Sequence, residues 1–242
     1  MKDPYIQNNG TLKNKFGITD YQKLNEAEKN ITFTKFLNID KTYKTKFDIN
    51  YLKSIHKHIF GDIFDWAGEF RTVPIEKEEI VIPRLSLDYA PVKEIESRLN
   101  IILEKMNNTD WKNIQSLDEK SLLFTQDLAE LWGIHPFRDG NTRTTLTFAN
   151  QFAKEHGFPL DLASLLDQLP RKFDANDKVT QYSIRDKFVL AALPKEYSPE
   201  PEHLNFLIHK AMLIGIQKNI ESLQSDLNTS SIHNNKSELD ER

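Results

Sequence analysis

Apolar residues recur every three or four positions along most of the chain, which places them on one face of an α-helix. Polar turns and proline or glycine residues separate the stretches that show this pattern. The spacing predicts a mostly α fold, in which the helices bury their apolar faces against one another as a bundle. The expected helices cover residues 20–36, 48–60, 91–106, 116–134, 141–155, 160–167, 177–193 and 204–216.

One region departs from helical spacing and predicts strands. Residues 71–75 and 80–83 are short apolar runs, joined by glutamate and lysine at 76–79. Two such runs around a polar turn are typical of a β-hairpin. We therefore expect a small hairpin here, and its simplest interpretation is a surface feature without a binding role.

Length and charge limit the class of protein. The chain has 242 residues, a net charge of −4 at pH 7 and a pI near 6.0. That length suits one well-filled core, so we expect a single domain over residues 1–227 and a polar, flexible tail over 228–242. The acidic balance argues against a general nucleic-acid binder.

The sequence also argues against several kinds of site and location. It contains no cysteine, so neither a disulfide framework nor a thiolate zinc site is available. His56 and His58 stand two positions apart on an expected helix and point to different sides, which disfavours a shared metal. No run approaches the roughly 18 apolar residues that span a bilayer. We expect a cytoplasmic protein without membrane contact, and export into a host by a signal-independent route stays open.

The densest group of chemically active residues is the stretch from Ile134 to Arg143. His135 titrates near neutrality, so it is the candidate general base. Asp139 is a carboxylate of the kind that holds Mg²⁺ beside phosphate oxygens. Gly140 and Asn141 predict a turn whose successive N–H groups bind an anion.

The flanking residues favour the same site. A helix is expected to begin near Asn141, so its positive dipole end would reinforce the anion site, and Arg143 would add forked donors. Pro136 is expected to restrict His135 to extended backbone, and Phe137 to anchor the loop in the core. Without further information, an ordinary polar connection between two helices explains the stretch equally well.

The motif resembles the signature of the Fic (Fic/Doc) family, His-Pro-Phe-x-(Asp or Glu)-Gly-Asn-x-Arg, and matches each fixed position over residues 135–143. The phrase at residues 12–18 is also similar to the entry of the first helix in bacterial, cell-filamentation-type Fic proteins. The resemblance implies a Fic-type helical bundle with a hairpin flap over the active site. It also implies a protein adenylyltransferase, which transfers AMP from ATP to a Ser, Thr or Tyr hydroxyl of a target protein and releases pyrophosphate.

The resemblance assigns roles position by position. His135 would deprotonate the target hydroxyl, Asp139 would coordinate Mg²⁺, and Pro136 and Phe137 would be structural. The flap would hold the target by main-chain pairing. The helix after the motif would line the nucleoside pocket, with Tyr182 or Arg185 as the candidates. The residues expected to bind the phosphates of ATP are Gly140, Asn141, Thr142 and Arg143, and those expected to dock the target are Ile75, Lys77, Ile80 and Val81.

Two positions depart from the family pattern. Thr142 stands where many adenylylating members have glycine and where the phosphorylating Doc branch has lysine. Leu146 stands where many adenylylating members have a second arginine. A Doc-like protein phosphotransferase, or transfer of another nucleotide, is therefore an alternative. A catalytically silent Fic-fold binding module is a further one.

Regulation is inferred from what the sequence lacks. The family's inhibitory pattern, (Ser or Thr)-x-x-x-Glu-(Gly or Asn), occurs nowhere in this chain. The arginine that such a glutamate would contact is replaced by Leu146. We therefore expect no intramolecular inhibitor of that kind, while a small antitoxin-like inhibitor protein, as in toxin-antitoxin pairs, remains a candidate partner.

Overall fold

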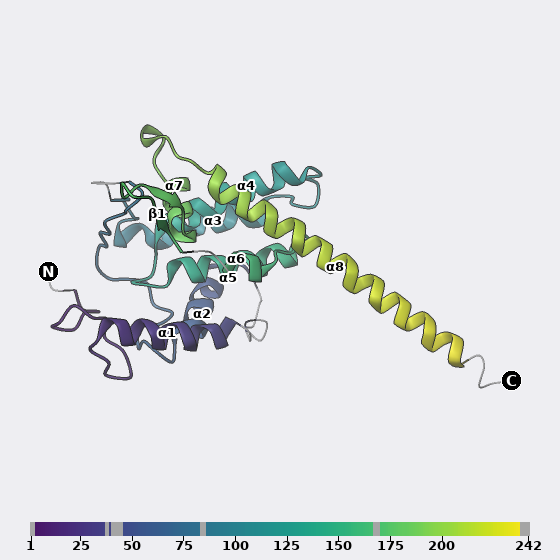
Figure 1. Ribbon diagram of the computed structural model, residues 1–242, viewed down its shortest axis with the longest axis horizontal. Coiled ribbons are helices and arrows are strands. Elements are labelled where there is room, and N and C mark those ends of the chain that lie inside the picture. The colour runs from purple at the N-terminus through teal and green to yellow at the C-terminus, as the bar shows by residue number, and fades with distance from the viewer. Residues whose placement is uncertain (1–2, 37–38, 40–45, 83–85, 167–169, 238–242) are drawn as a thin grey trace.

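The structure is a computed structural model that describes residues 3–36, 39, 46–82, 86–166 and 170–237, without the side chains of 166 and 226–237. Helices dominate it, as the apolar spacing predicted (Figure 1). The helices are α1 (Tyr21–Phe36), α2 (Ile49–Phe60), α3 (Ile95–Asn108), α4 (Leu117–Ile134), α5 (Asn141–Glu155), α6 (Leu162–Leu166), α7 (Ile184–Ala191) and α8 (Glu202–Ser237), with 3₁₀ turns η2 (Val92–Glu94) and η3 (Lys195–Tyr197). Strands β1 (Lys172–Phe173) and β2 (Val179–Gln181) form an antiparallel pair.

Short polar residues begin several helices where the sequence predicted them. The Asp48 side chain accepts the Tyr51 N–H at the start of α2, and Ser116 accepts the Glu119 N–H at the start of α4. Each cap satisfies one backbone donor that the first helical turn leaves unpaired. Local sequence therefore fixes these helix starts.

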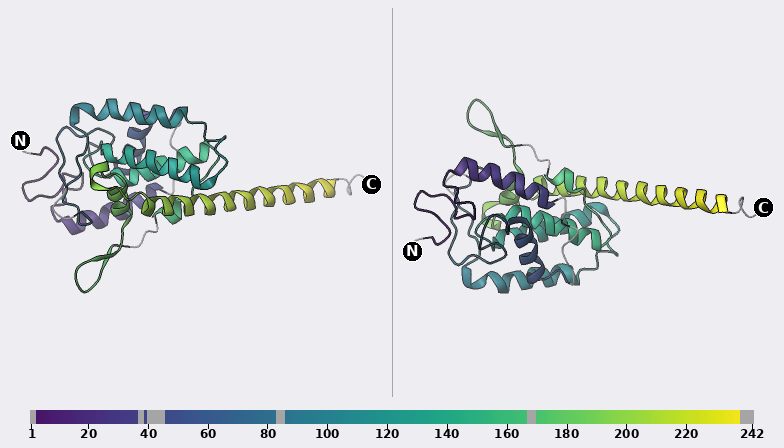
Figure 2. Two further views of the ribbon diagram at one scale, coloured as in Figure 1. Left: turned by 90° about the horizontal axis from the view of Figure 1, so that it is seen from above. Right: turned by 90° about the horizontal axis from the view of Figure 1, so that it is seen from below.

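The expected helix over 177–193 is wrong in its first half. A capping box between Ser183 and Asp186 begins α7 at Ile184. Before it, the Asp174 side chain accepts the N–H groups of Asn176 and Lys178, which closes the turn between β1 and β2. This turn stands out from the helical body (Figure 2).

The small sheet is present, but it does not lie where the sequence placed it. Within described residues 71–82 there is no strand; Pro83, the end of the expected hairpin, lies outside the described residues. Val73, Ile75 and Ile82 are buried in the core instead. These apolar residues are therefore spaced for burial in the core and not for pairing between strands. We call residues 71–82 the flap segment.

Helix α4 occupies the centre of the bundle, where it packs against α3, α5, α7 and α8, while α2 packs against α1, α3 and α5. The interior between these helices is rich in aromatic rings. Edge-on and stacked ring pairs hold α4 to α5 and to the segments beside them. Trp111, Phe124, Phe148, Phe152 and Phe158 are all 1% exposed or less.

Helix α8 extends well beyond the helical body (Figures 1 and 2). Its first part is anchored, because Leu204, Ile208 and Ala211 are completely buried. The helix continues to Ser237, so it includes residues 228–237 of the segment that we expected to be a polar, flexible tail. In the part of the chain described, no helix is both long enough and apolar enough to cross a bilayer.

Candidate active site

The loop of residues 135–140 joins the C-terminal end of α4 to the N-terminal end of α5. His135 is the residue that ends α4, and its φ of 52° and ψ of 58° lie in the left-handed region. The expectation of extended backbone was therefore wrong. The following proline disfavours the right-handed helical region, and the left-handed conformation also ends the helix.

Arg71 holds the first part of this loop through its backbone. Its Nε donates to the His135 carbonyl oxygen and its N–H donates to that of Pro136, each at 2.8 Å. The guanidinium also donates to the carbonyls of Val73 and Ala90 and is 2% exposed. One buried cation thus ties the loop to the flap segment.

His56 of α2 holds the second part of the loop. Its Nε2 donates to the Asp139 carbonyl oxygen at 3.1 Å, and its Nδ1 accepts the Gly68 N–H at 2.9 Å, which defines one neutral tautomer. Its ring stacks on Phe137 with 3.9 Å between ring centroids. Burial lowers the pKa of His56 to about 4. The residue is a support for the loop, and backbone groups occupy both of its nitrogens.

The His135 imidazole is buried and makes no hydrogen bond to the described residues. It is 1% exposed and stacks on Tyr89, with ring centroids 4.0 Å apart. Neither ring nitrogen has a hydrogen-bond partner among the described residues. Burial lowers the pKa of His135 well below its ordinary value, and the charges of Lys77 and Arg185 lower it further. The ring is therefore neutral at pH 7 and able to accept a proton.

Asp139 supplies a carboxylate on the other side of the loop. Burial raises its pKa, but Lys77, Arg143 and the Gly140 N–H outweigh that effect, and the pKa lies below its usual value. The Lys77 Nζ is 4.0 Å from Oδ1. An ionised carboxylate beside an anion site fits the ligand set of Mg²⁺, which takes one or two carboxylates together with phosphate and water oxygens.

The N-terminal end of α5 has the geometry of an anion site. Gly140 has a φ of 76°, and a Cβ there would lie 2.4 Å from the Phe60 ring, so only glycine fits. The Thr144 N–H donates to the Gly140 carbonyl, which leaves the N–H groups of residues 141–143 without partners inside the helix. These donors and the helix dipole attract negative charge.

Two side chains that were expected to bind phosphate have internal partners. The Asn141 side chain accepts the Phe137 N–H at 2.9 Å and donates to the Phe137 carbonyl at 2.8 Å, so it braces the loop. Thr142 Oγ1 accepts the Trp132 Nε1–H at 3.0 Å. What both residues offer to an anion is their backbone N–H.

Arg143 lies over the Phe60 ring and forms an ion pair with Glu28 of α1. Glu28 is buried, which raises its pKa, although Arg143 counteracts that effect. Sequence reasoning missed this pair. Its signal was a glutamate that shares the apolar spacing of Leu24 and Ile31 in the first expected helix.

These groups surround a cavity of about 480 Å³. The flap segment contributes Lys77 and Glu78, and α7 contributes Arg185, which sequence reasoning had considered only as a nucleoside contact. The other expected docking residues differ in position: Ile75 is buried in the core, Val81 is half-buried and Ile80 is 49% exposed. The full lining is Lys77, Glu78, His135, Asp139, Gly140, Asn141, Thr142, Arg143 and Arg185.

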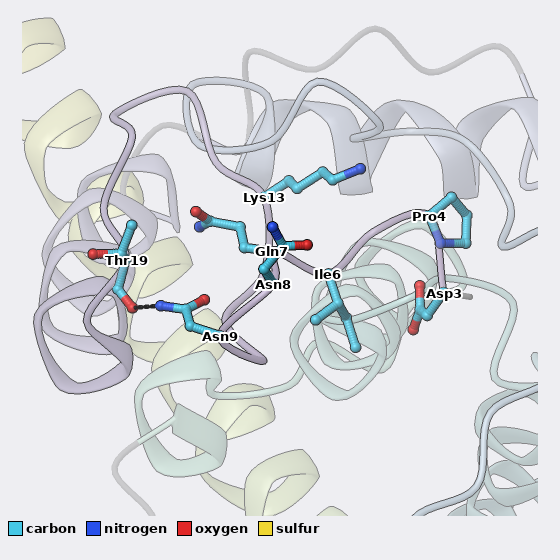
Figure 3. A pocket seen from close by; sticks show the side chains of 8 residues that line it. All are labelled: Asp3, Pro4, Ile6, Gln7, Asn8, Asn9, Lys13 and Thr19. Carbon is cyan, nitrogen blue, oxygen red and sulfur yellow. Dashed lines mark hydrogen bonds between the residues drawn. The ribbon is translucent and has the colours of Figure 1, made fainter.

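A larger cavity of about 770 Å³ lies in the N-terminal loop (Figure 3). Its amide side chains already serve the backbone: Gln7 donates to the carbonyls of Leu12 and Ile18, and Asn9 donates to that of Thr19. Asp3, at its edge, pairs with Arg138 of the motif loop. This region therefore braces the loop, and the chemistry concentrates in the smaller cavity.

A bundle of helices with this histidine-bearing anion loop defines a protein of the Fic type. The model of the Fic/DOC family matches residues 46–153, and the chain belongs to that family. Among solved structures it resembles BepC of Bartonella tribocorum with bound AMPPNP, at a TM-score of 0.64 and 21% identity over 86% of this chain and 95% of that one. It also resembles the N-terminal FIC domain of Bep8 from Bartonella sp. 1-1C, at a TM-score of 0.66 and 22% identity over 84% and 91%.

Curated relatives carry the name of an activity. The chain is 32% identical over 161 residues to the protein adenylyltransferase VbhT of Bartonella schoenbuchensis. The aligned region covers 66% of this chain and 32% of that protein. It is 26% identical over 164 residues to the probable protein adenylyltransferase Fic of Escherichia coli, and the aligned region covers 66% of this chain and 76% of that protein. The chain thus spans about a third of the length of VbhT.

Proposed function

We propose that this chain is a protein adenylyltransferase that transfers AMP from ATP to a hydroxyl group of a target protein. The observation that carries the proposal is the His135 imidazole, which is buried, neutral and without a hydrogen-bond partner among the described residues, beside the free N–H groups of α5. Relatives that bear the name protein adenylyltransferase support the same reaction.

In the proposed reaction, an imidazole nitrogen of His135 accepts the proton of the target hydroxyl. The hydroxyl oxygen forms a bond to the α-phosphorus of ATP, and the bond from that phosphorus to the bridging oxygen breaks, so pyrophosphate leaves. The N–H groups of residues 141–143 and the Arg143 guanidinium stabilise the negative charge on the phosphate oxygens. Asp139 would hold Mg²⁺, which when bound supplies further positive charge to the phosphates.

The flap segment is the proposed docking site of the target. It borders the cavity through Lys77 and Glu78 and exposes Ile80 at its turn. Its backbone from Ile75 to Glu78 forms no regular secondary structure, so its N–H and C=O groups would be available for pairing with an extended peptide. In this proposal Ile75 anchors the segment in the core, while Lys77, Ile80 and Val81 face the target.

The test compares the wild type with His135→Ala. Purified protein and lysate are incubated with Mg²⁺ and ATP labelled at the α- or the γ-phosphate. We expect the α-label to reach protein, and its transfer to fall by about 10² to 10⁴ in His135→Ala, because the general base is lost. His203→Ala, which alters a half-exposed histidine of α8, serves as the matched control.

Two results would contradict the proposal. Transfer of the γ-label would identify a phosphotransferase of the Doc type. Undiminished transfer of the α-label by a folded His135→Ala protein would remove His135 from the mechanism.

A further inference from the structure

Arg185 reaches the candidate active site from outside the motif. It is the second residue of α7, and its side chain lines the cavity together with His135 and the first turn of α5. Its guanidinium lies 5.6 Å from the Trp132 ring centroid, and Trp132 in turn donates to Thr142. Arg185 and Thr142 therefore line the same cavity, and the buried Trp132 side chain contacts both of them.

Buried partners hold this guanidinium in place. Its Nη2 forms an ion pair with the Glu79 carboxylate and donates to the Tyr89 hydroxyl at 3.1 Å. The Tyr89 hydroxyl donates to the same carboxylate at 3.0 Å, and Glu79 is 3% exposed. Within the described part of the chain, both bonds of Arg185 leave from one nitrogen, so the rest of its fork is available to a ligand.

The arrangement repeats that of Arg143, which lines the same cavity. Each arginine lines the cavity and lies over an aromatic ring, and each is paired with a buried glutamate, Glu28 for Arg143 and Glu79 for Arg185. A pair whose only role was to fasten the flap segment to α7 would not need to border the cavity. Along α5, Arg143 is the only cation in the first two turns, because position 146 is a buried leucine.

We propose that Arg185 binds a phosphate oxygen of the nucleotide, and that Glu79 and Tyr89 position its guanidinium for that contact. The inference rests on the proposed function, since it specifies how the nucleotide is held. It assigns Arg185 to the phosphates and not to the nucleoside, and it gives the flap segment a part in nucleotide binding through Glu79.

The experiment titrates four proteins with ATP, with inorganic tripolyphosphate and with adenosine, using calorimetry in the presence of Mg²⁺. The proteins are the wild type, Arg185→Gln, Arg185→Lys and Arg98→Gln. Arg98 is the matched control, because it is an exposed arginine whose pair with Glu94 lies on α3 and η2. Thermal unfolding of each protein reports whether the fold is retained.

We expect Arg185→Gln to weaken ATP and tripolyphosphate by about tenfold, because one charge-assisted hydrogen bond is lost, and to leave adenosine unchanged. Arg185→Lys should recover part of the loss, and Arg98→Gln should bind like the wild type. Unchanged tripolyphosphate binding in Arg185→Gln would overturn the inference, and so would an equal loss for adenosine.

Failure of the proposed function would show differently. A wild type that binds tripolyphosphate through Arg185 but transfers no α-label would keep the phosphate contact and reject adenylyl transfer. A wild type that binds neither ATP nor tripolyphosphate would overturn both.

Discussion

Hydrogen bonding distinguishes two chemically identical and equally buried side chains, the motif residue His135 and the loop support His56. His135 and His56 are both at most 1% exposed, and burial lowers the pKa of both. Backbone groups occupy both nitrogens of His56, whereas those of His135 have no partner among the described residues. Hydrogen bonding, and not the protonation state, decides which ring is free to react.

The low pKa of His56 predicts how stability depends on pH. Its pKa is about 4 in the folded protein and near 6.5 in the unfolded chain, so the unfolded state binds more protons between these values. Stability should therefore fall as the pH drops from 6.5 to 4, by up to roughly 3 kcal/mol from this residue alone. Urea unfolding at pH 7, 6 and 5 measures the effect.

The matching variant for that experiment is His56→Phe. It should be less stable at pH 7, because the Gly68 N–H and the Asp139 carbonyl lose their partner, and its stability should depend less on pH. His135 shifts in the same direction, so part of the pH dependence will remain. Parallel pH curves for the two proteins would show that His56 is not responsible.

The site is formed between packed elements, among them α2 and α5. Gly140 at the start of α5 lies against Phe60 at the end of α2, without room for a Cβ. We expect Gly140→Ala to destabilise the fold by about 2–3 kcal/mol, since it combines left-handed strain with a clash against a buried ring. It should also weaken ATP binding, because the first turn of α5 must move.

Gly157→Ala provides the control for that prediction. Gly157 has a φ of 83°, but a Cβ there would meet nothing within 4 Å. It should cost only the conformational strain, about 1 kcal/mol, and leave ATP binding unchanged. Equal losses of stability for the two variants in urea unfolding would show that the contact with Phe60 is unimportant.

The sequence predicted those elements that are determined by neighbouring residues in the chain. The starts of α2 and α4 follow from Asp48 and Ser116, and the assignment of His135 and Asp139 to one loop follows from the motif. The sequence did not predict that the backbone of the flap segment is irregular, because contacts with distant residues hold this segment. Glu79, for example, forms an ion pair with Arg185, which lies 106 positions further along the chain. The roles of His56 and Glu28 were missed for the same reason, since their partners, Asp139 in the loop and Arg143 in α5, lie 83 and 115 positions away.

At the scale of the whole molecule, the bundle and the projecting part of α8 are distinct regions. The buried residues of α8 lie between Leu204 and Gly215, whereas residues 217–225 are all exposed. We expect removal of residues 224–242 to change the melting temperature by less than about 2 °C and to leave transfer of the α-label unchanged. Differential scanning fluorimetry and the labelling assay measure both.

Ile208→Ala is the contrasting variant on the same helix. Ile208 is completely buried, so its truncation should cost about 2–4 kcal/mol. A strong rise in activity after removal of residues 224–242, with unchanged stability, would instead mean that this segment restrains the enzyme.

Hydrogen bonds to main-chain groups hold the loop that carries the motif along most of its length. Arg71 and His56 bind the carbonyl oxygens of His135, Pro136 and Asp139, and Asn141 binds both backbone groups of Phe137. Main-chain groups are the same whatever residue occupies a position. Exchange of the side chain at 139 therefore need not refold the loop, so we expect the same backbone framework to tolerate a change in the chemistry of this position.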